Sequence, residues 1–145
     1  MKATRQRPAA EGALDPAVRA RLVRAARGAR RRAYAPYSRF PVGAAVLTAD
    51  GRIYAGCNVE CGSFGLSQCA ERIAVHKAVS EGRRRIVAVA IVGPDRRELP
   101  PCGACRQVLR EFGSPLVILA RPGRPRVYRF EELLPHAFER PDGDR

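Results

Sequence analysis

Two short cysteine-containing segments constrain the fold of this chain of 145 residues more than any other feature. The first is Cys69–Arg72, which reads CAER, and the second is Pro100–Arg106, which reads PPCGACR. Each segment precedes a stretch with helical periodicity, so both are expected at helix N-termini. Together they offer three thiols that suit a zinc ion with its fourth position left for water: Cys69, Cys102 and Cys105. Three protein ligands are typical of a catalytic zinc, whereas a structural zinc is usually closed by four.

Two charged residues beside the first thiol suit this chemistry. Glu71 follows Cys69 by two residues, which is close enough to reach the water without binding the metal, and a carboxylate there could act as general acid and base. The helix N-termini favour thiolates. Because three thiolates over-neutralise a divalent ion, Arg72 is placed to offset their charge by donating hydrogen bonds to ligand sulfurs. The alternative for Arg72 is an exposed helix residue.

The cysteines also allow other interpretations. A lone C-x-x-C can be a redox motif, but no Trp or cis-Pro pattern of that kind surrounds this one. A closed structural zinc site would leave Cys69 as a buried thiol and Glu71 without a role. Its four ligands would be Cys57, Cys61, Cys102 and Cys105.

Hydrophobic periodicity predicts an α/β fold. Two almost entirely apolar runs, 86–92 and 116–120, read as strands buried on both faces, and a helical pattern precedes each of them. Such an order predicts crossover units on a mixed sheet with helices on both faces. The helices are expected at about 16–33, 68–80, 103–112 and 131–134, and the strands at 42–48, 52–59, 86–92, 116–120 and 127–130. The first helix is amphipathic, and we expect its apolar face to pack on the sheet through Val18, Leu22, Ala25, Ala26, Ala29 and Ala33.

The length and composition indicate one domain. A hydrophobic content of 46% is ordinary for a globular protein. We expect a disordered basic tail at 1–13, a single catalytic domain at 14–138 and a polar tail at 139–145. No apolar run approaches the roughly 20 residues that span a bilayer, and the N-terminal residues show no secretory signal. We therefore expect a cytoplasmic protein without a membrane partner, where five cysteines favour metal binding or catalysis over disulfides.

The net charge of +13 could indicate a surface that binds nucleic acid. The basic residues are 25 arginines and only two lysines, in a chain also rich in Ala, Gly and Pro, as the codon usage of a GC-rich genome would produce. We therefore interpret the charge as mostly a solvated surface, and nucleic acid is not the expected partner.

Several motifs together resemble those of the small cytidine deaminases that act on free nucleosides. Besides the two cysteine segments, which match the C-x-E and P-C-x-x-C pattern of zinc deaminases, these are Tyr34–Ala45 (YAPYSRFPVGAA), Gly56–Glu60 (GCNVE), Arg106–Val108 (RQV) and Glu132–Pro135 (ELLP). They follow in the family order and at family-like spacing, and the resemblance covers about residues 14–138.

This resemblance implies a three-layer α/β/α cytidine deaminase-like fold with a mixed five-stranded sheet, and usually a homotetramer. It implies hydrolytic conversion of cytidine or 2′-deoxycytidine to the uridine product and ammonia, with zinc as cofactor. By similarity, Cys69, Cys102 and Cys105 bind zinc, and Glu71 shuttles protons. The residues implied in substrate binding are Asn58 and Glu60 at the ribose, Phe40 beside the pyrimidine, Ala70, and Phe138 from a neighbouring subunit.

Other roles remain open at these positions. Asn58 and Glu60 also suit a turn, and Phe40 and Phe138 also suit core packing. The chain departs from the family pattern at Cys61, where Asn is usual, and at Phe64, where Tyr is common. These departures motivate a second hypothesis, a deaminase of a modified cytosine nucleoside or nucleoside antibiotic. A third is a basic nucleic-acid-binding module with a structural zinc.

Overall fold

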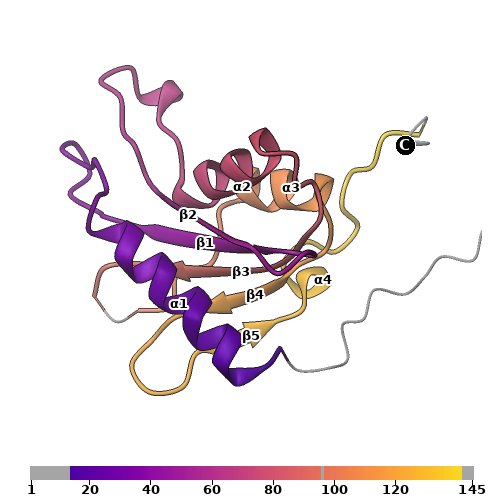
Figure 1. Ribbon diagram of the computed structural model, residues 1–145. Helices are drawn as coiled ribbons and strands as arrows, with labels where there is room; N and C mark the ends of the chain where they lie inside the picture. Colours follow the sequence, from indigo (N-terminus) through magenta and orange to yellow (C-terminus); the bar gives the residue numbers. More distant parts are fainter. Residues whose placement is uncertain (1–13, 96, 142–145) are drawn as a thin grey trace, which may run out of the picture.

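The fold is known from a computed structural model that describes residues 14–95 and 97–141. Its described elements are α1 (Pro16–Arg30), β1 (Gly43–Thr48), β2 (Ile53–Cys57), a short 3₁₀ turn η1 (Phe64–Leu66), α2 (Ala70–Ser80), β3 (Ile86–Val92), α3 (Gly103–Glu111), β4 (Leu116–Leu119), β5 (Arg126–Tyr128) and α4 (Phe130–Leu133). The strands form one sheet in the order β2-β1-β3-β4-β5. Figure 1 shows α1 on one side of this sheet, with α2 and α3 on the other.

The sheet is mixed, as the sequence predicts. Strand β1 pairs antiparallel with β2 and β3, β3 and β4 run parallel, and β5 closes the other edge antiparallel to β4. The parallel pair is joined through α3, and α2 carries the chain from β2 across to β3. In the chain, β2 precedes α2 and β3 precedes α3, and these two strands run in the same direction. Both helices therefore begin at the same end of the strands. The two cysteine segments lie at those helix starts.

Helix α1 forms the layer on one face. Asp15 caps its N-terminus, because the carboxylate accepts hydrogen bonds from the backbone N–H groups of Ala17 at 2.7 Å and Val18 at 3.3 Å. Leu22 and Ala26 are fully buried against the sheet, together with side chains from alternate positions of β1 and β3. The expected amphipathic packing of this helix is confirmed.

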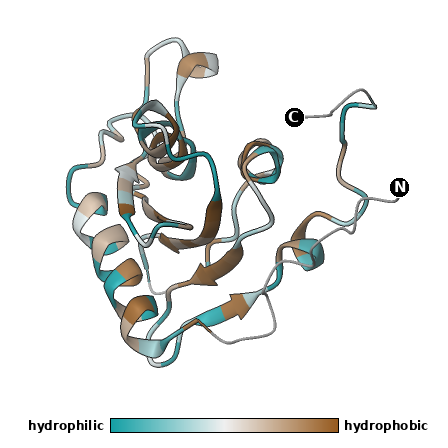
Figure 2. Cartoon of the chain, turned by 45° about the vertical axis from the view of Figure 1, so that its right-hand side comes forward, coloured by the Kyte–Doolittle hydropathy of each residue, from teal (hydrophilic) through white to brown (hydrophobic). Residues whose placement is uncertain are grey.

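Helices α2 and α3 cover the opposite face with a second apolar cluster. Ala74 of α2 and Leu109 of α3 are fully buried there, beside the other alternate positions of β1 and β3, such as Val46 and Val89. Figure 2 shows the sheet mainly in the hydrophobic colour, while the helices carry both colours. The thiol-bearing helix starts are thus fixed by packing on a buried sheet.

Several element boundaries differ from the sequence predictions. Residues 127–130 were expected as one strand, but Phe130 begins α4, where Oε1 of Glu132 accepts a hydrogen bond from the backbone N–H of Arg129 at 3.0 Å. Helix α2 begins at Ala70 and not at Gln68, because Gln68 pairs with Val59 in an antiparallel bridge. Helix α1 ends at 30 and not at 33, and the strand predicted at 52–59 is limited to 53–57.

Two further expectations concern the predicted tails and the absence of a membrane-spanning helix. The basic tail predicted at 1–13 lies outside the described residues, as does most of the tail predicted at 139–145. Within the part of the chain that the structure describes, no helix has the length and apolar character that crossing a bilayer requires.

Candidate active site

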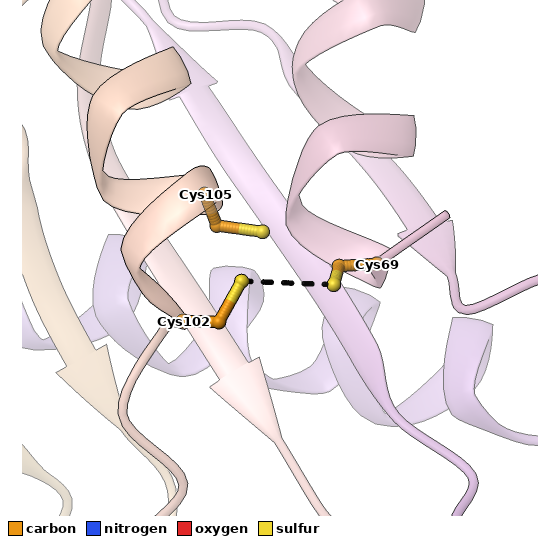
Figure 3. Close-up of side chains that lie close together, drawn as sticks. All are labelled: Cys69, Cys102 and Cys105. Carbon is orange, nitrogen blue, oxygen red and sulfur yellow. Dashed lines mark hydrogen bonds between the residues drawn. The ribbon is translucent and has the colours of Figure 1, made fainter. Parts of the chain in front are cut away.

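Three thiols meet where α2 and α3 begin. The Sγ atoms of Cys69, Cys102 and Cys105 all lie within 4.8 Å of one another, and the Cys69 and Cys102 sulfurs are 3.8 Å apart. Figure 3 shows Cys105 on the first turn of α3, with all three side chains directed toward one point. This is the group that the sequence predicts, and Cys57 and Cys61 are not part of it. The alternative closed site is therefore wrong.

Local structure explains why these thiols converge. Cys69 and Cys102 are the N-cap residues of α2 and α3, and neither side chain caps its own helix, which leaves both sulfurs available. The segment before Cys102 is held by Arg106, which donates hydrogen bonds to the carbonyl of Pro101 at 2.8 Å and that of Leu133 at 2.6 Å. Pro101 is itself fully buried.

The environment of the thiols favours a thiolate at Cys69. A hydrogen bond from the Cys105 thiol, followed by one from Arg72, lowers the pKa of Cys69 to about 5. The same contact with Cys69, together with burial, raises the pKa of the Cys105 thiol. These contacts therefore favour the charged form at Cys69 and the protonated form at Cys105.

Glu71 lies in the first turn of α2 and is only 5% exposed. Burial is the main reason that its pKa is raised to about 7, and the negative charge at Cys69 adds to the effect. A carboxyl group whose pKa lies near neutrality can both accept and deliver a proton, as general acid–base catalysis requires. The helix start thus places a buried carboxyl group with a raised pKa beside the thiols.

Arg72 reaches the thiols from the next position of α2. Its Nη2 donates to the Cys69 sulfur at 3.6 Å, and this hydrogen bond is the main reason that the pKa of Arg72 is raised. Among the described residues, Arg72 Nε is a buried polar atom without a hydrogen-bond partner. A guanidinium aimed at clustered thiols suits a thiolate-rich metal centre, because its charge offsets that of the ligands. The donor set therefore fits a zinc ion.

The predicted ribose-binding residues lie on the loop after β2, residues 58–69, which is hydrogen-bonded to the loop before β1, residues 31–42; these two loops are called the loop pair. Asn58 is bound on both sides of its amide, since Oδ1 accepts from the Val42 N–H at 2.8 Å and Nδ2 donates to the Phe40 carbonyl at 2.9 Å. Glu60 accepts hydrogen bonds from the backbone N–H groups of Tyr37 and Ser38. These contacts confirm a loop-holding role for both side chains, and their contact with substrate stays a prediction.

The remaining predicted substrate residues occupy different surroundings. Ala70 is fully buried at the start of α2, next to Cys69 and Glu71. Phe40 is 39% exposed and Phe138 is 68% exposed, so core packing is the wrong interpretation for both side chains within this chain. An exposed aromatic ring is available to contact a ligand or a second subunit.

Sequence reasoning gave no role to two residues that the structure connects to the site. Arg106 anchors the Pro101–Cys102 segment, and Ser38 joins Glu60 to Phe40 through its hydroxyl. Ser38 precedes Phe40 by two residues, a spacing at which serine commonly binds a backbone N–H. That spacing, and the place of Ser38 within the motif Tyr34–Ala45, were the signals available in the sequence.

Comparison with known proteins agrees with this geometry. Residues 17–121 match the family model described as the cytidine and deoxycytidylate deaminase zinc-binding region. A cytidine deaminase from Halalkalibacterium halodurans is 49% identical over 124 residues, which cover 83% of this chain and 94% of that protein. One from Mycobacterium tuberculosis is 51% identical over 106 residues, covering 73% of this chain and 78% of the relative. The crystal structure of cytidine deaminase from Burkholderia pseudomallei superposes with a TM-score of 0.77 at 48% identity, covering 82% of this chain and 98% of that one.

The protein has an α/β/α fold with three thiols beside a buried carboxyl group. Together with the match to the family model, these features place it in the class of α/β deaminases with a thiol-rich metal-binding region. The chain belongs to the cytidine deaminase family. The family and fold that the sequence motifs predict are thereby confirmed, and the chain is an enzyme of this family.

Proposed function

We propose that this enzyme hydrolyses cytidine and 2′-deoxycytidine to uridine and 2′-deoxyuridine with release of ammonia, as a step of pyrimidine salvage. The observation that carries the proposal is the convergence of three thiols within 4.8 Å of one another beside the buried Glu71. Relatives at 49% and 51% identity bear the name cytidine deaminase, which supports the substrate class.

Zinc is the proposed cofactor, held by Cys69, Cys102 and Cys105. When bound, it would supply a Lewis acid that makes water a competent nucleophile near neutral pH. Arg72 offsets part of the negative charge of the ligands through its hydrogen bond to the Cys69 sulfur, which keeps the centre from becoming too electron-rich.

Glu71 is the proposed proton carrier. It accepts a proton from the attacking water and delivers it to N3 of the cytosine ring, while the new C–O bond forms at C4. It then takes a proton from the new C4 hydroxyl group and delivers it to the exocyclic amino group, so that the C4 carbonyl forms as the C4–N bond breaks and ammonia leaves. A pKa of about 7 suits each of these transfers, because the carboxyl group is neither a strong acid nor a strong base at neutral pH.

The loop pair is the proposed nucleoside-binding region. Asn58 and Glu60 would bind the ribose hydroxyls, Phe40 would flank the pyrimidine, and Ala70 would contact the base from the start of α2. We also propose a homotetramer in which Phe138 completes the site of a neighbouring subunit. The exposure of the Phe138 ring, 68%, supports this assignment, because a large apolar side chain gains free energy when a partner covers it. Because free thiols must persist to hold the metal, we propose the reducing cytoplasm as its location.

Loss of the cytosine ultraviolet band on mixing with cytidine tests the proposal. Wild type with one bound zinc per chain should convert cytidine, and Glu71→Gln should keep its zinc but lose at least about 10²-fold in kcat, since only the proton carrier changes. Cys69→Ala should lose zinc. A wild-type enzyme that holds zinc but leaves both cytidine and deoxycytidine unchanged would refute the assigned substrates.

A modified cytosine nucleoside is the second candidate substrate. The departures from the family pattern at Cys61 and Phe64 favour this candidate. Phe64 is 72% exposed and contacts Tyr37 edge to face, with ring centroids 5.5 Å apart. Comparing kcat/KM for cytidine with that for cytosine nucleosides carrying altered sugars distinguishes the two. A clear preference for the unmodified nucleosides would eliminate this candidate.

A further inference from the structure

Ser38 lies between two residues that the proposed function assigns to the substrate. Its hydroxyl donates a hydrogen bond to Oε1 of Glu60 and accepts one from the backbone N–H of Phe40 at 3.1 Å. A serine hydroxyl offers one donor and two acceptor directions, so both contacts can form at once. One side chain therefore connects the proposed sugar-binding carboxylate to the backbone of the proposed base-flanking residue.

The hydrogen-bond inventory of Glu60 shows how tightly this carboxylate is held. Oε2 accepts from the backbone N–H groups of Tyr37 at 2.8 Å and Ser38 at 3.2 Å, and Oε1 accepts from the Ser38 hydroxyl. A carboxylate has about four acceptor directions. Three are used by the loop, and the one that remains belongs to Oε1, the oxygen that Ser38 contacts. The Ser38 hydroxyl is also the main reason that the pKa of Glu60 is lowered, which keeps it an ionised acceptor.

The backbone between the two contacts has a conformation that needs such support. Arg39 has a φ of 55°, in the left-handed region that residues with a side chain rarely adopt. Two hydrogen bonds hold this turn. The Arg39 N–H donates to the Ala35 carbonyl at 3.0 Å, and the Phe40 N–H donates to Ser38 Oγ. Without the hydroxyl, the turn that positions Phe40 loses one of these two bonds.

Ser38 and Glu60 also line the same open pocket of about 290 Å³, together with Tyr37, Phe64 and Ser67. The contacts of Ser38 thus lie at a cavity wall that a ligand can reach, and not in a part of the loop that is remote from any cavity. Since Ser38 is itself exposed, its hydroxyl contributes little to the core of the fold.

We propose that Ser38 is a positioning residue that couples the orientation of Glu60 to the backbone at Phe40, so that sugar and base contacts form together. This inference rests on the proposed function of the loop pair. Ser38 acts through those two residues and has no chemical step of its own. Its loss should therefore weaken nucleoside binding and leave proton transfer at Glu71 intact.

Steady-state kinetics of five variants with cytidine test the coupling. Ser38→Ala should raise KM about fivefold to tenfold with kcat nearly unchanged, the loss expected for about one hydrogen bond of typical net strength. Ser38→Thr keeps the hydroxyl and should restore most of the wild-type KM. Ser63→Ala is the matched control, because Ser63 is exposed in the neighbouring loop and makes no side-chain cap hydrogen bond. It should behave as wild type.

The fourth variant combines Ser38→Ala with Glu60→Gln and separates positioning from independent binding. If Ser38 acts through Glu60, the double variant should show nearly the same KM as Glu60→Gln alone, because coupled residues are not additive. Additive losses, or a Ser38→Ala enzyme with wild-type KM, would overturn the proposal. Absence of turnover in the wild type would instead refute the proposed function, so the two failures are distinguishable.

Discussion

Replacing Gly56 with alanine tests how the sheet positions the catalytic helix. Gly56 lies in β2 directly beneath α2, and a Cβ atom there would approach Ala74 N to 2.7 Å and the Ala70 carbonyl oxygen to 2.8 Å. Both are backbone atoms of α2, the helix that has Cys69 as its N-cap and carries Glu71. Because backbone cannot rotate away as a side chain can, the helix itself has to move.

The magnitude follows from these distances. Ordinary van der Waals contact begins at 3.4 Å, so α2 must shift by at least about 0.6 Å, the difference from the 2.7–2.8 Å contacts. Overpacking of this kind costs about 1–3 kcal/mol of folding free energy, and the smaller entropy of the unfolded alanine chain offsets about 0.4–1 kcal/mol. Since a misplacement of about 1 Å can cost 10²-fold in rate, we expect a roughly tenfold loss of kcat/KM.

Urea denaturation and cytidine turnover measure the two effects, with turnover assayed where both proteins are folded. The matched control is Gly65→Ala, because a Cβ at Gly65 meets nothing within 4 Å. It should leave turnover unchanged and raise the free energy of unfolding only by the entropy effect, about 0.4–1 kcal/mol. A Gly56→Ala enzyme with wild-type stability and turnover would refute the argument that close β2–α2 contact sets the position of Glu71.

Three further predictions concern stability and use urea denaturation. Asp50→Asn should destabilise the protein at pH 7, because the Thr48 hydroxyl, and then Arg83, lower the pKa of Asp50 below its ordinary 3.8. This stabilisation is fully present above pH 3.8 and is lost as the pH falls through the lowered pKa of Asp50. The unfolding free energies of wild type and Asp50→Asn should therefore converge in acid, and a difference that stays constant with pH would contradict the prediction. Asp15→Ala removes the α1 cap and should cost about 1 kcal/mol. Leu109→Ala, at a fully buried position, should cost about 2–5 kcal/mol, and a loss below 1 kcal/mol would show that the α3 interface is loosely packed.

The layers of the fold could be predicted because local pattern and packing agree. The periodicity of α1 identified Leu22 and Ala26 as core residues, and the apolar run 86–92 became β3 at those bounds. The prediction failed where a local cap competed with hydrophobicity. Phe130 alternates with Tyr128 and resembles a strand residue, yet Oε1 of Glu132 accepts a hydrogen bond from the backbone N–H of Arg129, and Phe130 becomes the first residue of a helix.

The thiol centre could be predicted for a related reason. Its ligands come from two short segments, and a helix start follows each. Because β2 and β3 run in the same direction, the two helix starts lie at the same end of the sheet and the sulfurs meet. The bonds of Glu60 could not be predicted in this way. They join residues separated by 22 and 23 positions across two irregular loops, whose approach depends on the register of β1 against β2 and on the Tyr34–Val59 bridge. No short-range pattern encodes that pairing.

The helix starts that carry the thiols and the loops that carry Asn58 and Glu60 differ in how firmly the fold holds them. Cys105 and Ala70 are fully buried on helices that pack against the sheet, so a substitution there disturbs metal binding and the core together. The loop pair is held mainly by exposed hydrogen bonds, which contribute less to folding. Changes such as those at Cys61 and Phe64 can therefore alter which nucleoside binds while the thiols and Glu71 keep their positions. It follows that differences in substrate preference within this fold should arise from the loops, and differences in metal affinity from the helix starts.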